Sequence, residues 1–370
     1  MMKKNPIFVT QPSLPPLEEL IPYLEQVWEN KILSNGGPFH KKLEDELCKY
    51  LNVPYISLVS NGTMGLITAL QALNIKGEVI TTPYSYVATS QSLMWNKIKP
   101  VFIDIDPVTL NLDPKKIEAA ITPDTSAIMP VHVYGQPCDV DAIEILAKKH
   151  KLKVIYDAAH AFGVKCHCGG LLKHGDLSIL SFHATKVFNT FEGGAIICKD
   201  IKMKHHIDQI KNFGITSETT VEHIGINGKM NEFSSVLGLL QLKYIEDNIK
   251  KRKVINDHYR AGLKDINGIR CHTKSKVEYD NYSYFPIFVD DEYPLTRDQL
   301  YSKLKDSGIN GRRYFYPLIT EFPIYKNLLK KQEVDLSIAK EASKRVICLP
   351  IYSEMDFKTV EQVLDLIKQK

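Results

Sequence analysis

The sequence has no long apolar run and no block of like charges. No stretch reaches the roughly 18 apolar residues of a membrane-spanning helix, and residues 1–16 turn polar and proline-rich before a signal-peptide core could form. The formal net charge of +4 comes from lysines and arginines spread along 370 residues, which argues against a nucleic-acid surface. We therefore expect a cytoplasmic protein with no membrane partner and no nucleic-acid partner.

Cysteines and common phosphate-binding motifs are also scarce. The seven cysteines, an odd number spread along the chain, do not indicate a disulfide framework and suit a reducing compartment. Neither G-x-G-x-x-G nor a P-loop occurs, so no dinucleotide or nucleoside triphosphate site is indicated. Cys166, His167 and Cys168 with His174 suggest a metal, but this C-x-C has no second pair and residues 168–176 are typical of a hairpin turn. We expect no metal site.

Short apolar runs alternate with helical patterns through the first two-thirds of the chain. The expected strands cover residues 55–60, 78–83, 101–106, 126–135, 153–157, 178–182 and 193–198, with helices between most of them, one of which follows Asp113. This alternation predicts an α/β fold with a mainly parallel central sheet and helices on both faces. A long helix over 231–263 then leads to a smaller α+β part, so we expect two domains, 1–248 and 249–370.

Polar side chains gather where the expected strands end, the edge at which open parallel sheets bind ligands. They are Tyr84, Tyr86, Asp104, Asp106, His132, Tyr134, Asp157 and His160. Asp157 ends an apolar run and would be costly to bury without a partner. That partner could be a lysine, a backbone amide or the protonated ring nitrogen of a bound cofactor.

Lys186 lies on a short connection between two expected buried strands. A buried lysine is costly unless its lowered pKa is used, as it is in Schiff-base catalysis. Pairing with Glu192 as a structural lysine is the alternative. Similarly, residues 61–63 join a strand to a helix, where Gly62 and Thr63 either present free N–H groups to an anion or form a plain helix cap.

Five segments follow one another in a distinctive order: NGT at 61–63, YSYVAT at 84–89, VIYDAAHAFG at 154–163, SFHATKVFNTFEGGAI at 181–196 and GINGKMNE at 225–232. Together they resemble the DegT/DnrJ/EryC1/StrS family of nucleotide-sugar aminotransferases, a branch of the fold type I pyridoxal phosphate enzymes. The resemblance covers nearly the whole chain. The wording of 181–196 is closest to the family members that form dTDP-4-amino-4,6-dideoxyglucose, the viosamine precursor.

The resemblance implies roles for the residues around Lys186. Lys186 would hold pyridoxal 5'-phosphate through a Schiff base and, once released by an amino donor, move the proton between Cα and C4′. Asp157 would keep the pyridine nitrogen protonated, which makes the ring a better electron sink. Tyr86 would stack on the ring, and His160 would bond its phenolic oxygen or pack beside it. Tyr84 is expected to be core or rim.

The resemblance also implies a phosphate site shared between two subunits. The Gly62 and Thr63 amides and the Ser181 hydroxyl would hold the phosphate. An asparagine of the neighbouring subunit completes this site in the family, and Asn227 is the matching position, ahead of Asn231. The protein is therefore expected to be a homodimer with shared active sites.

The expected reaction moves nitrogen from L-glutamate, which becomes 2-oxoglutarate, to C4 of a dTDP-4-keto-6-deoxyhexose for surface polysaccharide. Reaction at C3 of a dTDP-3-keto sugar or at C4 of a GDP-linked keto sugar is the alternative, and a non-catalytic binding protein is a remote one. Relatives that remove a sugar hydroxyl have histidine where Lys186 stands. His183, Arg313 and Tyr316 are expected to line the sugar pocket, which residues 34–38 would border, although Arg313 also suits a surface ion pair.

Overall fold

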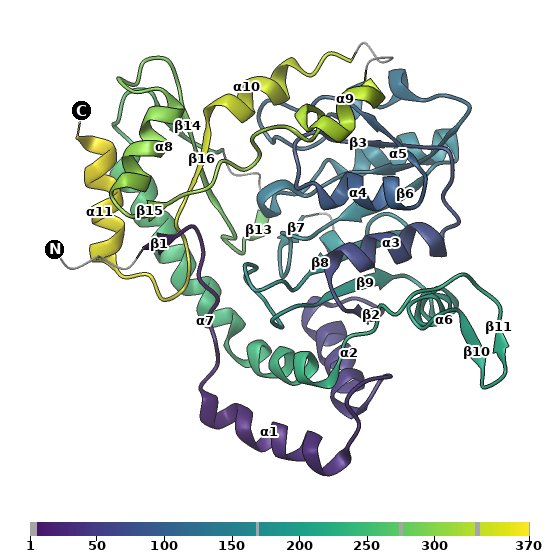
Figure 1. Ribbon diagram of the computed structural model, residues 1–370. Helices are drawn as coiled ribbons and strands as arrows, with labels where there is room; N and C mark the ends of the chain where they lie inside the picture. Colours follow the sequence, from purple (N-terminus) through teal and green to yellow (C-terminus); the bar gives the residue numbers. More distant parts are fainter. Residues whose placement is uncertain (1–5, 168–169, 274–276, 330–333, 370) are drawn as a thin grey trace.

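A seven-stranded sheet fills the centre of the molecule in the computed structural model, which describes residues 6–167, 170–273, 277–329 and 334–369 (Figure 1). Its strands are β2 (Tyr55–Val59), β3 (Glu78–Thr81), β4 (Lys99–Phe102), β5 (Thr125–Met129), β6 (Lys153–Asp157), β8 (Leu177–Ser181) and β9 (Gly194–Cys198). Their order across the sheet is β2-β9-β8-β6-β5-β3-β4. Only β9 runs against its neighbours, so the predicted mainly parallel sheet is confirmed.

Helices cover both faces of this sheet, as predicted. The helices of the large part of the chain are α1 (Leu17–Asn30), α2 (Pro38–Leu51), α3 (Gly62–Ala72), α4 (Ala88–Trp95), α5 (Val140–His150), α6 (Ile201–Ile210) and α7 (Glu232–Leu263). Leu43 and Leu47 of α2 share one core cluster with α5 and α7, while Leu66 and Leu70 of α3 share another with α4 and α6. Because both faces are covered, strands such as β9 (GAIIC) are buried along their whole length and have no polar side chain facing solvent.

Polar side chains fix where the helices near the sheet edge begin. The Asn61 side chain accepts the Met64 N–H at 2.8 Å, which starts α3 two residues after β2 ends. The Asn231 side chain accepts the Ser234 N–H at 2.8 Å and starts α7 in the same way. Such caps satisfy N–H groups that have no partner within the helix. The first turn of α3 therefore lies directly at the carboxyl edge of the sheet.

The C-terminal part has a core of its own around an antiparallel sheet of β12 (Ile269–Cys271), β14 (Phe285–Val289) and β16 (Val346–Leu349). Helices α8 (Arg297–Asp306) and α11 (Phe357–Lys368) pack on it with the second half of α7. Helix α10 (Ser337–Arg345) packs near β14 and β16 through Ala339 and Ala342, while Tyr325 of α9 (Pro323–Leu329) packs on Phe102 of β4. Strand β1 (Ile7–Phe8) pairs with β15 (Ile309–Asn310), so the N-terminal residues lie with this part. Helix α7 runs across from one part to the other (Figure 1), and a division at residue 248 stays a prediction.

Two local predictions were wrong. The segment after Asp113 forms two short 3₁₀ helices, Pro114–Lys116 and Glu118–Ala120, instead of an α-helix, because Ile117 alone is buried there and no apolar stripe develops. Strand β7 (Lys165–Cys166) pairs with β13 (Val277–Tyr279) and not in a local hairpin. Between α6 and α7, strands β10 (Ile215–Ser217) and β11 (Thr220–Val221) form a hairpin.

Within the described ranges, no helix is long and apolar enough to cross a membrane. The same residues contain no group of three or more His, Cys, Asp or Glu side chains that could hold a metal ion, and Cys168 lies outside them. Five cysteines have free thiols, Cys48, Cys138, Cys198, Cys271 and Cys348, and Cys166 is in a disulfide.

Candidate active site

Adjacent strand ends bring the predicted residues to one edge of the sheet. Asp157 is the last residue of β6, and Lys186 follows β8, its neighbour in the sheet. Gly62 begins α3 directly after β2. Because β2, β6 and β8 run in the same direction, all three residues lie at the carboxyl edge.

The Lys186 amine lies in a partly buried setting that lowers its pKa. Burial lowers the pKa of Lys186 to about 8, and the negative charge of Asp157 and the Tyr86 phenol oppose this shift. Nζ donates a hydrogen bond to the Tyr284 hydroxyl at 3.3 Å. Glu192, the structural partner considered from the sequence, instead faces His183 at 3.5 Å. Lys186 is thus available for chemistry.

The carboxylate of Asp157 is buried, with 5% of its surface exposed, and holds two hydrogen bonds. Thr89 of α4 donates its hydroxyl to Oδ2 at 2.7 Å, and the Ala159 N–H donates to Oδ1 at 3.1 Å. Burial raises the pKa of Asp157, against the effect of these donors and of the Lys186 charge. A carboxylate in such a place gains from a cationic partner. Thr89 was not predicted, since nothing local distinguishes it from other helix threonines.

The ring of His160 is held in one neutral tautomer. Its Nδ1 accepts the Tyr134 N–H at 3.2 Å, which leaves the proton on Nε2. Burial, and then the charge of Lys186, lower the pKa of His160 well below its usual range. The ring packs parallel to Phe315 with centroids 6.1 Å apart. His160 therefore offers one N–H donor and no charge.

The first turn of α3 forms a narrow cradle against the end of β8. A Cβ on Gly62 would lie 2.9 Å from the Cβ of Ser181, and a Cβ on Gly194 would lie 2.8 Å from the Gly62 nitrogen. Only glycine at these two positions lets the helix start approach the Ser181 hydroxyl so closely. Thr63 is the next residue of the same turn. Free N–H groups, the positive end of the helix and a hydroxyl together make a site for an anion.

Two tyrosines of the loop before α4 have different roles. Tyr86 is 61% exposed, unusual for an aromatic ring at the centre of a site, and its phenol acts electrostatically on Lys186. Tyr84 is fully buried and donates to the Tyr314 carbonyl at 3.3 Å. Tyr84 is therefore core, one of the two places expected for it.

Aromatic residues from the C-terminal part close the other side of the site. Tyr284 lies 4.8 Å from the His160 ring and 5.8 Å from the Tyr314 ring, centroid to centroid. The buried Phe315 packs between Tyr134 and Tyr84. The sequence did not single out Tyr284, which lies 98 residues beyond Lys186 and outside every motif, whereas Phe315 lies between Arg313 and Tyr316, which were expected at the sugar pocket.

Known proteins match this chain along nearly its whole length. Residues 17–368 match the DegT/DnrJ/EryC1/StrS aminotransferase family. The chain belongs to this family. A dTDP-4-amino-4,6-dideoxy-D-glucose transaminase of Shigella dysenteriae is 55% identical over 366 residues, 99% of each chain. One of Escherichia coli with the same name is 50% identical over 370 residues, 100% of each chain. Among solved structures, DesI with its TDP-sugar product has a TM-score of 0.94 at 31% identity, covering 99% of this chain and 93% of that one.

Family membership confirms the predicted resemblance and the predicted class, a pyridoxal-phosphate-dependent aminotransferase. PseC of Helicobacter pylori, a structural neighbour, has a TM-score of 0.91 at 26% identity, covering 99% of both chains. The residues of this chain fit the cofactor on their own geometry. The Gly62 cradle suits a phosphate, the buried Asp157 forms no ion pair among the residues that the structure describes, and the Lys186 amine lies at the next strand end.

The predicted sugar-pocket residues contact other side chains in this structure. His183 is exposed and faces Thr185 and Glu192. Arg313 donates to Asp298 at 2.8 Å, and the rings of Tyr301 and Tyr316 lie 4.6 and 4.9 Å from its guanidinium. The surface ion pair considered for Arg313 is thus present. These three assignments, like that of the exposed Asn227, stay predictions.

Three other strand-end residues have structural roles. Asp104 is fully buried and accepts the N–H groups of Ile338 and Ala339 at 2.9 and 2.8 Å, at the start of α10. Asp106 accepts N–H groups of the turn that follows it. His132 stacks on Tyr156 with centroids 4.7 Å apart. Sequence position alone could not separate them from Asp157.

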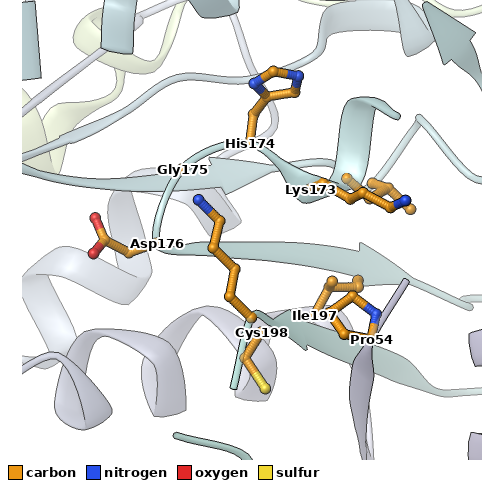
Figure 2. Close-up of a pocket in the computed structure, with 9 residues that line it drawn as sticks. Pro54, Lys173, His174, Gly175, Asp176, Ile197 and Cys198 are labelled. Carbon is orange, nitrogen blue, oxygen red and sulfur yellow. The ribbon is translucent and has the colours of Figure 1, made fainter. Parts of the chain in front are cut away.

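A hollow of about 180 Å³ lies at the edge of the sheet opposite to Asp157 and Lys186 (Figure 2). It is lined by Pro54, Leu172, Lys173, His174, Gly175, Asp176, Ile197, Cys198 and Lys199. Its carboxylate, Asp176, already binds Lys153 at 2.8 Å and the Val154 N–H at 2.9 Å. We assign no site there.

Proposed function

We propose that this protein transfers the amino group of L-glutamate to C4 of a dTDP-4-keto-6-deoxyhexose and so forms dTDP-4-amino-4,6-dideoxy-D-glucose for surface polysaccharide. The 55% and 50% identical relatives, which carry that reaction in their names and match end to end, support the substrate. A GDP-perosamine synthase of Escherichia coli O157:H7, the kind of relative that would favour a GDP-linked sugar, is 31% identical. The observation that carries the chemistry is the Lys186 amine beside the buried Asp157.

In this proposal Lys186 both holds the cofactor and moves a proton. Pyridoxal phosphate supplies an electron sink for the negative charge that develops at the amino acid's Cα. With a pKa of about 8, the Lys186 amine takes up a proton and returns it near neutral pH. Asp157 holds a positive ring nitrogen, and the Nε2–H of His160 donates to the phenolic oxygen. The exposed ring of Tyr86 stacks against the cofactor face.

The phosphate end is held by the amides of Gly62 and Thr63 and by the Ser181 hydroxyl. We propose that Asn227 serves the neighbouring subunit's phosphate in a cytoplasmic homodimer. Exposed apolar side chains around α1 and the 213–224 hairpin support a second copy of this chain as the cover. They are Leu14, Leu17, Ile21, Trp28, Ile32, Leu33, Phe213, Ile215, Val221 and Ile224, which is 88% exposed.

At the sugar end, His183, Tyr316 and Arg313 line the pocket in our proposal. Arg313 would meet the pyrophosphate by leaving its ion pair with the exposed Asp298. That exchange is feasible because an exposed pair contributes little to stability, about 0–1 kcal/mol. The Glu232 carboxylate accepts the Phe39 N–H at 2.9 Å, which ties the end of the loop of residues 34–38 to the start of α7.

The colour of the holoenzyme and the position of the new amine test this function. We expect the wild-type protein to be yellow with pyridoxal phosphate, to lose that absorbance with borohydride, and Lys186→Ala to be colourless. Incubation with glutamate and each candidate keto sugar, followed by NMR, locates the amine, and 2-oxoglutarate reports turnover. An amine at C3, or turnover only with the GDP-linked sugar, would contradict the substrate. A yellow Lys186→Ala protein would contradict the role of the lysine.

A further inference from the structure

The Lys186 amine has an unusual hydrogen-bond partner, the hydroxyl of Tyr284. The two atoms are 3.3 Å apart, and Nζ lies 5.8 Å from the centre of the Tyr284 ring. Among the residues that the structure describes, no carboxylate lies within 4.0 Å of this nitrogen. The amine is therefore oriented by a phenol.

The Tyr284 ring is held firmly. It immediately precedes β14, the middle strand of the C-terminal sheet. The rings of His160, Tyr134 and Tyr314 surround it with centroids 4.8, 5.8 and 5.8 Å away, the last at an interplanar angle of 87°. Few rotamers are open to a ring packed on three sides. Its hydroxyl is thus a fixed point toward which the flexible lysine stem can be directed.

We propose that Tyr284 is a positioning residue for Lys186, holding the amine by a neutral hydrogen-bond acceptor with its lone pair free. This inference rests on the proposed role of Lys186. A carboxylate in the same place would hold the amine equally well but would stabilise the ammonium form, which cannot act as a base. Burial raises the pKa of Tyr284, so the phenol keeps its proton over the working pH range. A phenol therefore orients the amine without adding a charge.

The position of Tyr284 in the chain gives this contact a further consequence. Lys186 belongs to the sheet of the large part, whereas Tyr284 belongs to the C-terminal part. The orientation of the amine therefore depends on the position of the C-terminal part relative to the large sheet. A shift of the C-terminal part would affect proton transfer by Lys186 more than it would affect cofactor binding at Gly62.

The test measures the basicity of Lys186 in the cofactor-free protein. Acetic anhydride labels neutral amines, and peptide mass spectrometry against pH gives the titration midpoint of each lysine, with the exposed Lys49 as internal reference. Tyr284→Phe removes the acceptor of the ammonium, so we expect the Lys186 midpoint to fall by about one pH unit. Tyr134→Phe is the matched control, since its hydroxyl bonds Tyr84 and the Tyr314 carbonyl. It should leave the Lys186 midpoint unchanged.

In the holoenzyme, Tyr284→Phe should lower kcat about tenfold while KM for glutamate and sugar stays within about threefold. An unchanged Lys186 midpoint with unchanged kcat would overturn the proposal. If Tyr284→Phe does not fold, 3-fluorotyrosine at position 284 keeps the shape and weakens the acceptor. A smaller shift in the same direction supports the proposal, and no shift overturns it. A colourless Lys186→Ala protein combined with no Tyr284 effect would overturn this inference alone.

Discussion

Replacing Thr89 by valine should slow the reaction without touching any group that contacts substrate. Valine keeps the shape of threonine and removes the hydroxyl that donates to Asp157 Oδ2 at 2.7 Å. Thr89 is fully buried, so no water can take the place of that donor without moving α4. The substitution therefore isolates one hydrogen bond to the carboxylate.

The size of the effect follows from the strength of that bond. A hydrogen bond to a charged group contributes about 1.5–3 kcal/mol, and 1.36 kcal/mol corresponds to one pKa unit. Burial already raises the pKa of Asp157, and the loss of Thr89 as a donor moves it further up. A less stable carboxylate holds a positive ring nitrogen less well. We expect kcat to fall by about 10- to 100-fold.

The assay compares kcat, the absorbance of the bound cofactor and thermal stability for Thr89→Val and for Ser85→Ala. Ser85 bonds the Thr89 hydroxyl at 2.8 Å and not the carboxylate, so its removal should have a much smaller effect on kcat. Wild-type kcat and absorbance in a folded Thr89→Val protein would refute the reasoning. Equal losses in both variants would show that packing around α4, and not the bond to Asp157, is responsible.

Three further changes test the anion cradle, the buried carboxylate and the charge network behind the sheet. Gly62→Ala adds a Cβ 2.9 Å from Ser181, and we expect weaker binding by tenfold or more in a pyridoxal phosphate titration. Asp157→Asn should raise the melting temperature of the cofactor-free protein above about pH 4, since it removes a buried charge, yet weaken cofactor retention. Glu44 of α2 forms ion pairs with Lys204 and Lys211. Burial acts to raise the pKa of Glu44, but the His40 hydrogen bond and these two lysines hold this pKa well below its usual range. The stability that Glu44 provides is lost as pH falls below about 4.5, so Glu44→Gln should lower stability by about 3 kcal/mol at pH 7 and flatten this acid dependence in denaturant titrations.

The large sheet and the position of Lys186 could be predicted because local patterns and the topology agree. Runs such as residues 153–157 and 178–182 have apolar centres, Val154–Tyr156 and Ile179–Leu180, as expected for strands covered on both faces, and each forms a strand. Parallel strands bring their ends to one edge, so Asp157 and Lys186 had to lie near each other. The helix expected after Asp113 failed for the opposite reason, since its pattern had no apolar stripe to bury.

The rest of the site depends on contacts between distant segments. Thr89 reaches Asp157 across 68 residues, and Tyr284 reaches Lys186 across 98. Neither has a spacing that marks it, because the packing of whole elements sets both contacts. Asp104 also follows a strand end, but its carboxylate accepts hydrogen bonds from the N–H groups at the start of α10. Only the fold shows which carboxylate is left for a ligand.

The lowered pKa of the Lys186 amine results from the balance between burial and one charged neighbour. Asp157 at the end of β6 favours the charged form, and burial against the C-terminal aromatic residues favours the neutral one, which brings the pKa to about 8. If Asp157 were the hydrogen-bond partner of Nζ, its charge would act at full strength and the amine would be a poor base. The Thr89 and Ala159 donors keep that carboxylate directed elsewhere, while Tyr284 holds the amine. The basicity of Lys186 thus depends on Asp157 in two ways. The carboxylate lies near enough to raise the pKa of the amine, but its own hydrogen bonds go to Thr89 and Ala159 and not to Nζ.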